Sequence, residues 1–116
     1  MTDKIVVLCT CASAEEAERL ARGLVEAQLA ACVNVIPHVR SYFRWKGALE
    51  SADEYLLAIK SSRGLFDALR VHLATLHSYE VPEVAAVPIV AGSENYLNWL
   101  EATLNPPGVN QPGEDA

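Results

Sequence analysis

Two cysteines near the start of the chain have the spacing of a site for a soft metal ion. Cys9 and Cys11 end an apolar run that is typical of a β-strand, so both thiols should point to the same face, with Cα atoms about 6.6 Å apart. Thiolates at this spacing can share Cu(I) or zinc. Free cysteines are also common as small buried hydrophobic residues, and no Cys-x-x-Cys pair accompanies these two. The pattern is compatible with both interpretations.

A second group of reactive side chains lies between residues 77 and 83. It combines an imidazole, a phenol and two carboxylates, from His77, Tyr79, Glu80 and Glu83. These groups suit metal binding or acid–base chemistry. The structural alternative is a histidine that interacts with a helix C-terminus, followed by solvated acids. Pro82 restricts the backbone here, which favours a fixed segment over a loose loop.

The sequence contains none of the short motifs that mark common enzymes and nucleotide-binding proteins. G-x-G-x-x-G, the P-loop, G-x-S-x-G and H-E-x-x-H are all absent. Serines, histidines and carboxylates are present, but no spacing orders them into a catalytic triad. We therefore expect a protein that is not an enzyme, with no catalytic residues and no organic cofactor.

A fold must position these side chains, and the longest feature of the sequence is a β-hairpin over residues 31–61. Lys46-Gly47 joins its two arms, because glycine accepts the positive φ of a tight turn. Each arm spans roughly 40 Å, whereas a compact domain of this size is roughly 35 Å across. The end of the hairpin should therefore extend beyond the core, and exposed aromatic side chains there favour association with another subunit. These aromatic residues are Tyr42, Phe43 and Trp45.

Apolar periodicity predicts the elements on either side of the hairpin. A strand at 5–11 leads into a helix that Ser13 caps, with Glu16 three residues on, and we expect this helix to end near residue 30. Ser61 or Ser62 should cap a second helix, which the later Pro82 prevents from continuing. A strand over 84–90 and a helix from Gly92-Ser93 to residue 104 follow.

The predicted order of elements is β-α-β-β-α-β with one added helix. This is the ferredoxin-like α+β arrangement, in which two helices cover one face of an antiparallel sheet. Pro37 and Pro88 each predict a bulge or an edge position, because proline cannot donate to a sheet ladder. We predict a single domain over residues 1–104 and a flexible tail rich in proline and glycine over 105–116.

Composition limits the partners and the location. The 116 residues carry a formal net charge of −6, which disfavours sequence-independent nucleic-acid binding. No apolar run approaches the roughly 20 residues of a membrane span, and no signal-peptide cleavage pattern is present. We therefore expect a cytoplasmic protein that binds neither nucleic acid nor membrane. Its three cysteines, Cys9, Cys11 and Cys32, should be free thiols.

Several separated motifs resemble the CutA divalent-cation tolerance family, in order, from about residue 5 to residue 104. They are Ala31-Cys32-Val33-Asn34, Pro37, Ser41, Trp45-Lys46-Gly47, Glu54, Lys60, His77-x-Tyr79-Glu80-Val81-Pro82-Glu83, Pro88-Ile89 and Tyr96-Leu97-x-Trp99-Leu100. The resemblance implies a ferredoxin-like fold, a homotrimer built by the long hairpins, and an architecture similar to that of PII signalling proteins. It also implies a role in tolerance of copper and other divalent cations.

The resemblance further implies a weak site for copper or another divalent metal. The ligands proposed in the family are a cysteine of the first strand and two adjacent histidines. The cysteine corresponds to Cys9 and the second histidine to His77, whereas the first histidine is replaced here by Leu76. Ser78 also stands where relatives have proline. This chain therefore retains two of the three proposed ligands.

A cleft between subunits is the other site that the resemblance implies. Its expected lining is Cys32, Trp45, Glu54, Lys60, Tyr79 and Glu83. The main hypothesis is a homotrimer that acts in cation homeostasis and binds copper weakly at Cys9 and His77. One alternative is a PII-like module that binds a small anionic metabolite in the cleft, with charge from Lys60. The other is a trimeric scaffold for protein interactions.

Overall fold

The computed structural model describes residues 2–105, so the predicted tail lies outside the described residues except for Asn105. One four-stranded antiparallel sheet has the order β2-β3-β1-β4. The elements in chain order are β1 (Lys4–Cys11), α1 (Ala14–Glu26), β2 (Cys32–Trp45), β3 (Ala48–Ser62), the 3₁₀ helix η1 (Arg63–Leu65), α2 (Phe66–Leu76), β4 (Ala85–Pro88) and α3 (Glu94–Leu104). The predicted ferredoxin-like α+β fold is confirmed.

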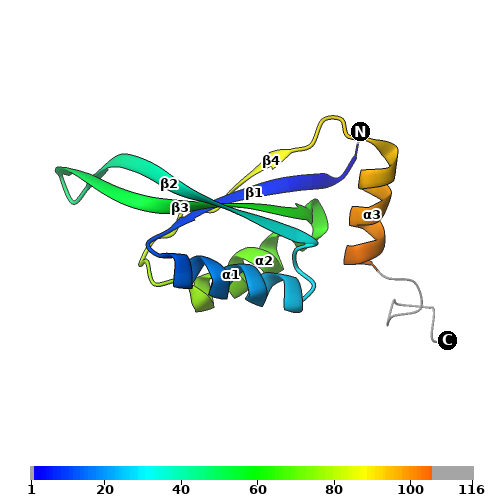
Figure 1. Cartoon of the computed structure of the whole chain (residues 1–116), viewed down its shortest axis with the longest axis horizontal. Helices are drawn as coiled ribbons and strands as arrows, with labels where there is room; N and C mark the ends of the chain where they lie inside the picture. The colour runs from blue at the N-terminus through cyan, green and yellow to red at the C-terminus, as the bar shows by residue number, and fades with distance from the viewer. Residues whose placement is uncertain (1, 106–116) are drawn as a thin grey trace.

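Two helices cover one face of the sheet and leave the other face open. Figure 1 shows α1 and α2 side by side below the strands, with α3 at the end of the sheet away from the hairpin tip. Alternate residues of β1, namely Val7, Cys9 and Cys11, are fully buried against these helices. Leu20 and Leu24 of α1 complete this layer together with leucines of α2. The intervening residues of β1 must therefore lie on the open face.

The helix boundaries differ from the sequence-based prediction. Helix α1 ends at Glu26 rather than near residue 30, because Gln28 has a φ of 59° and the N–H groups of Leu29 and Ala30 both donate to the carbonyl of Leu24. This left-handed turn satisfies carbonyl groups that the helix end leaves free. The second helix also begins late, because η1 precedes Phe66. Ser62 is extended there and its side chain makes no capping hydrogen bond.

The hairpin and its proline irregularity are confirmed. The β2–β3 register shifts between Ile36 and Val39, on either side of Pro37 and His38. His38 has a φ of 64°, so the bulge places one non-glycine residue in the left-handed region. The turn at the tip has φ values of 49° at Lys46 and 83° at Gly47, as a tight hairpin requires.

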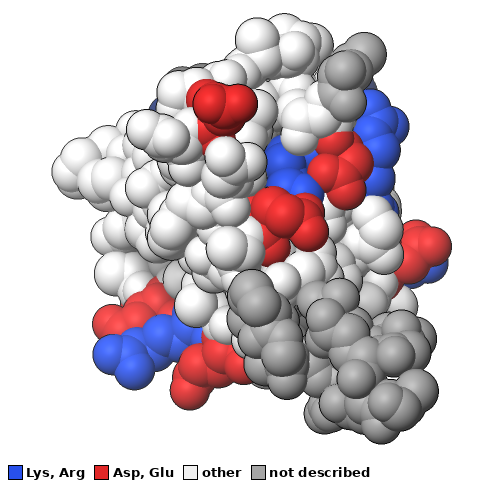
Figure 2. Space-filling model, turned by 90° about the vertical axis from the view of Figure 1, so that its right-hand side faces the viewer, with Lys and Arg blue, Asp and Glu red and all other residues white. Residues whose placement is uncertain are grey.

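Helix α3 is attached to the end of the sheet by a small second core and by a buried lysine. Leu100 and Leu104 pack against Ala31. Lys4 Nζ lies 2.6 Å from a carboxylate oxygen of Glu101 and 2.7 Å from one of Asp3. Figure 2 views this end and shows acidic and basic side chains next to one another among uncharged residues. Within residues 2–105, no helix is long and apolar enough to cross a membrane.

Candidate functional site

His77 lies at the centre of a hydrogen-bonded group at the end of β1. Its side chain is 0 % exposed. Nδ1 accepts a hydrogen bond from the backbone N–H of Tyr79 at 3.0 Å, and Nε2 lies 2.8 Å from the carbonyl oxygen of Thr10. Because Nδ1 accepts, Nε2 carries the proton of the neutral ring and donates to Thr10. Both ring nitrogens are therefore engaged inside the protomer.

Cys9 converges on the same carbonyl group as His77. Its Sγ lies 3.7 Å from the carbonyl oxygen of Thr10, so the thiol and the imidazole are neighbours. Burial, followed by the adjacent Cys11, raises the pKa of the Cys9 thiol to about 12. A thiol with such a pKa is protonated at neutral pH, whereas metals bind the thiolate. The described residues contain no group of three or more metal-binding side chains.

Cys11 and Leu76, the other two positions of the predicted metal region, have contacts of their own. Cys11 Sγ is 3.7 Å from the carbonyl oxygen of Ser13, and burial raises the pKa of its thiol to about 11. Leu76 packs between the helices, where its Cδ1 would lie only 2.7 Å from a Cβ added at Gly23. Leu76, at the position where the resemblance implies a histidine ligand, therefore contributes to the contact between α1 and α2.

Glu16 is a residue of this site that the sequence did not reveal. Its carboxylate accepts hydrogen bonds from the backbone N–H of Ser78 at 2.7 Å and of Ala12 at 3.3 Å, and it lies 3.5 Å from His77 Nδ1. Burial raises the pKa of Glu16, but these hydrogen bonds and His77 outweigh it, so the pKa is lowered. The capping pattern with Ser13 identifies the helix start, but no sequence signal shows a contact 62 residues away.

Glu54, which is buried, and Tyr79, which is half-buried, form a hydrogen-bonded pair next to this group. The Tyr79 hydroxyl donates to Glu54 Oε2 at 2.7 Å, and Glu54 is 6 % exposed. Burial and then the bond to the carboxylate raise the pKa of Tyr79. A cavity of about 340 Å³ lies beside them and is lined by Ala12, His38, Asp53, Glu54 and Tyr55. The bulge places His38 there.

The six residues expected in a cleft form separate groups in the protomer. Cys32 lies opposite Lys60 at the end of the sheet near α3, whereas Trp45 lies opposite Ala48 at the hairpin tip. Lys60 is six residues from Glu54 along β3, which corresponds to about 20 Å. Glu54 and Tyr79 form a third group, joined by a side-chain hydrogen bond. Glu83 is exposed, and its charge helps to raise the pKa of Cys9.

Comparisons with known proteins all point to one family, and the matches extend over almost the whole chain. The family model "CutA1 divalent ion tolerance protein" matches residues 5–103. A divalent-cation tolerance protein CutA of Pectobacterium atrosepticum is 41% identical over 90% of this chain and 94% of its own length. The chloroplastic protein CutA of Arabidopsis thaliana is 43% identical over 84% of this chain, which spans 53% of that protein.

A solved structure gives the same result for the fold. The periplasmic divalent cation tolerance protein CutA of Archaeoglobus fulgidus superposes with a TM-score of 0.84 and 38% identity, covering 87% of this chain and 98% of its own. Since these relatives are described as chloroplastic or periplasmic, the cytoplasmic location stays a prediction. The chain belongs to the CutA1 divalent ion tolerance family.

Proposed function

We propose that this protein acts in divalent-cation tolerance as a homotrimer, in which the hairpin of each protomer lies across the open sheet face of the next. The observation that carries this proposal is the apolar character of that face. The β-ladder register places on it Val6, Leu8, Ile36, Leu56, Ala58, Ala85 and Val87, with Cys32, Asn34 and Lys60. A monomer that exposed this surface would be prone to unspecific association.

The hairpin provides a matching apolar surface. Tyr42, Phe43, Trp45 and Leu49 are each at least 40 % exposed at its outer end. Aromatic residues of this kind are typical of interface centres. If one hairpin crosses a neighbouring sheet, Trp45 and Glu54 of one protomer approach Cys32 and Lys60 of the next. A cleft between subunits would thus unite side chains that lie far apart in the protomer.

Weak copper binding at Cys9 and His77 is part of the proposal. A thiol and an imidazole that meet at one carbonyl oxygen are a donor pair suited to Cu(I). Binding would require loss of the hydrogen bond from His77 to Thr10 and loss of a proton from Cys9, whose pKa is about 12. Both changes cost free energy, which is why we propose a weak site.

Substitutions on opposite sides of the sheet test the assembly. Ile36 on the open face is 42 % exposed and Val25 on α1 is 41 % exposed. We expect the wild type and Val25→Glu to have the mass of a trimer by light scattering, and Ile36→Glu to have that of a monomer. A monomeric wild type, or a trimeric Ile36→Glu, would contradict the proposed interface.

Anaerobic titration with Cu(I) against a competing chelator tests the metal site. We expect about one ion per chain, with affinity reduced at least about tenfold by Cys9→Ser and by His77→Gln. Cys32→Ser is the control, because Cys32 lies on the opposite face of the sheet. Circular dichroism establishes that each variant is folded. Unchanged affinity in Cys9→Ser would refute the site.

The PII-like alternative has one observation in its favour. Lys60 is partly buried on the open face and forms no ion pair within the described residues. Citrate should raise the melting temperature of the trimer, and Lys60→Ala should abolish this shift without changing the mass. The hypothesis of a trimeric scaffold predicts neither copper binding nor a rise in melting temperature with citrate.

A further inference from the structure

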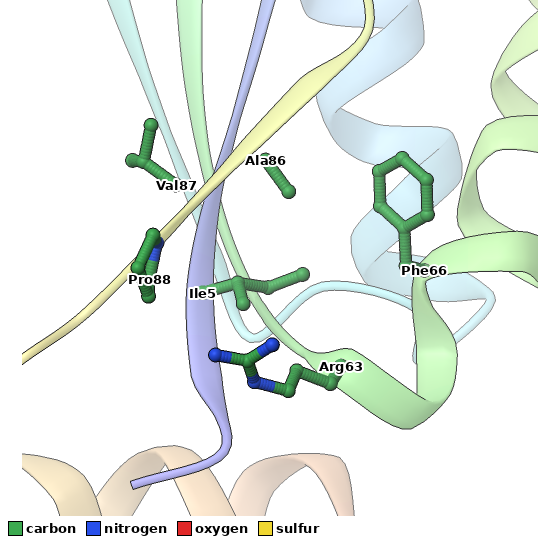
Figure 3. Close-up of a pocket in the computed structure, with 6 residues that line it drawn as sticks. All are labelled: Ile5, Arg63, Phe66, Ala86, Val87 and Pro88. Carbon is green, nitrogen blue, oxygen red and sulfur yellow. The ribbon is translucent and has the colours of Figure 1, made fainter. Parts of the chain in front are cut away.

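A small cavity lies on the helix side of the sheet edge, away from the copper region, and one of its lining residues, Val87, also belongs to the open sheet face of the proposed subunit contact. It has a volume of about 270 Å³ and is lined by Ile5, Arg63, Phe66, Ala86, Val87 and Pro88. Figure 3 shows the Ala86 side chain directed to the side on which Phe66 lies, whereas Val87 points to the opposite side. Arg63 extends below Ile5 toward β1.

The walls of this cavity are fixed by backbone hydrogen bonds and by the core. The N–H of Arg63 donates to the carbonyl of Asp3 at 2.9 Å, and the N–H of Ile89 donates to that of Lys4 at 3.1 Å. Ile5 is 3 % exposed and belongs to the main core, against which Phe66 packs. The cavity is therefore formed before any ligand enters, which lowers the conformational cost of binding.

Arg63 supplies the single charge among otherwise apolar lining residues. Its side chain forms no hydrogen bond within residues 2–105, although its charge contributes to the lowered pKa of Asp3. The Asp3 carboxylate is instead bonded to Lys4 Nζ at 2.7 Å. The guanidinium is thus available for a planar anion with two acceptor oxygens.

We propose that this cavity binds a small monocarboxylate with a flat apolar body. One guanidinium matches one carboxylate in a bidentate pair, whereas a phosphate dianion would need further donors that the lining does not provide. At about 30 Å³ for each water-sized unit, the volume corresponds to a ligand of about nine non-hydrogen atoms. Phe66 and the aliphatic residues contact its apolar part, and Arg63 fixes its orientation.

The binding probe is phenylacetate, and the neutral phenylacetamide of the same size is its control. Titration of the ¹⁵N-labelled full chain should shift the amide signals of Ile5, Phe66 and Ala86 to saturation, with a dissociation constant in about the millimolar range. Phenylacetamide should bind at least about tenfold more weakly, because it lacks the charge that pairs with Arg63. Equal binding of the two compounds, or shifts confined to other regions, would overturn the proposal.

Three variants test separately whether binding needs the charge of Arg63 and whether it needs the space inside the cavity. Arg63→Ala should weaken phenylacetate binding about tenfold or more, whereas Arg22→Ala, which removes an exposed guanidinium paired with Glu18, should leave it unchanged. Ala86→Leu should block binding by filling the cavity while Arg63 remains. Normal binding by Arg63→Ala or by Ala86→Leu would show that the cavity is not the site. Neither result depends on copper binding at Cys9 and His77.

Discussion

Glu16 connects three segments that are far apart in the sequence. Its carboxylate holds the N–H groups of Ala12 and Ser78 next to His77, while Ser13 caps the helix that carries it. A buried carboxylate is tolerated only because these donors replace its lost hydration. The geometry of His77 and of Tyr79 therefore depends on an acid outside the predicted 77–83 segment.

We expect Glu16→Gln to lower the free energy of unfolding by about 1–3 kcal/mol, because one backbone N–H then faces an amide NH₂ instead of an acceptor. The pKa of Glu16 in the folded protein lies below its ordinary value of 4.5. The carboxylate therefore contributes fully to the free energy of unfolding above pH 4.5, and this contribution is lost as the pH falls through the pKa of the folded protein. Urea unfolding between pH 3 and 7 should show that the free energy of unfolding falls less at acidic pH in Glu16→Gln than in the wild type. Exposed Glu15→Gln is the control, and an equal effect there would refute the assignment.

The Tyr79–Glu54 pair should be energetically more important than its single hydrogen bond suggests. Tyr79→Phe leaves the Glu54 carboxylate, which is 6 % exposed, without its hydroxyl partner. We expect a loss of about 1–3 kcal/mol in urea unfolding, and a smaller loss when Glu54→Gln is already present. Tyr42→Phe, at a residue 69 % exposed, should change stability by less than about 0.5 kcal/mol. Additive effects of the two substitutions would show that the pair is not coupled.

At the scale of elements, local patterns predict most of the sheet and little of the site. Leu57 and Ile59 of β3 are buried at alternate positions, as the period of a strand requires, and Pro37 correctly indicates the bulge. The end of α1 is not predictable in this way, because Gln28 has a left-handed conformation that its residue type rarely adopts. The contact of Glu16 with Ser78 is equally hidden, because it depends on how α1 and the end of α2 meet in space.

The hairpin turn allows a test of backbone strain, because Gly47 in the turn can be compared with Gly64, where an added side chain has equally open space. A Cβ added at Gly47 or at Gly64 would meet open space, but only Gly47 has a positive φ, of 83°. Gly47→Ala should therefore cost about 1 kcal/mol, whereas Gly64→Ala should be neutral or stabilising. Chemical unfolding at one fixed protein concentration measures both. Equal effects of the two substitutions would mean that backbone strain at the turn is relaxed elsewhere.

The whole molecule is more extended than its size alone would suggest. Its dimensions are 55 × 29 × 23 Å and its radius of gyration is 15.7 Å, compared with about 13 Å for a compact domain of this length. The outer part of the hairpin contributes to this length while burying little of its own apolar surface (Figure 1). A chain of this size has limited core to support such a projection.

Folding and assembly should therefore be linked. If the trimer buries the open face and the hairpin aromatics, dilution favours the unfolded chain, so the melting temperature of the wild type should fall as protein concentration falls. Ile36→Glu should melt at a lower temperature that does not depend on concentration, whereas Val25→Glu should behave as the wild type does. Calorimetry over a hundredfold range of concentration measures this difference. A wild-type melting temperature that stays constant over that range would mean that the protomer is stable alone and that the hairpin needs no partner to remain folded.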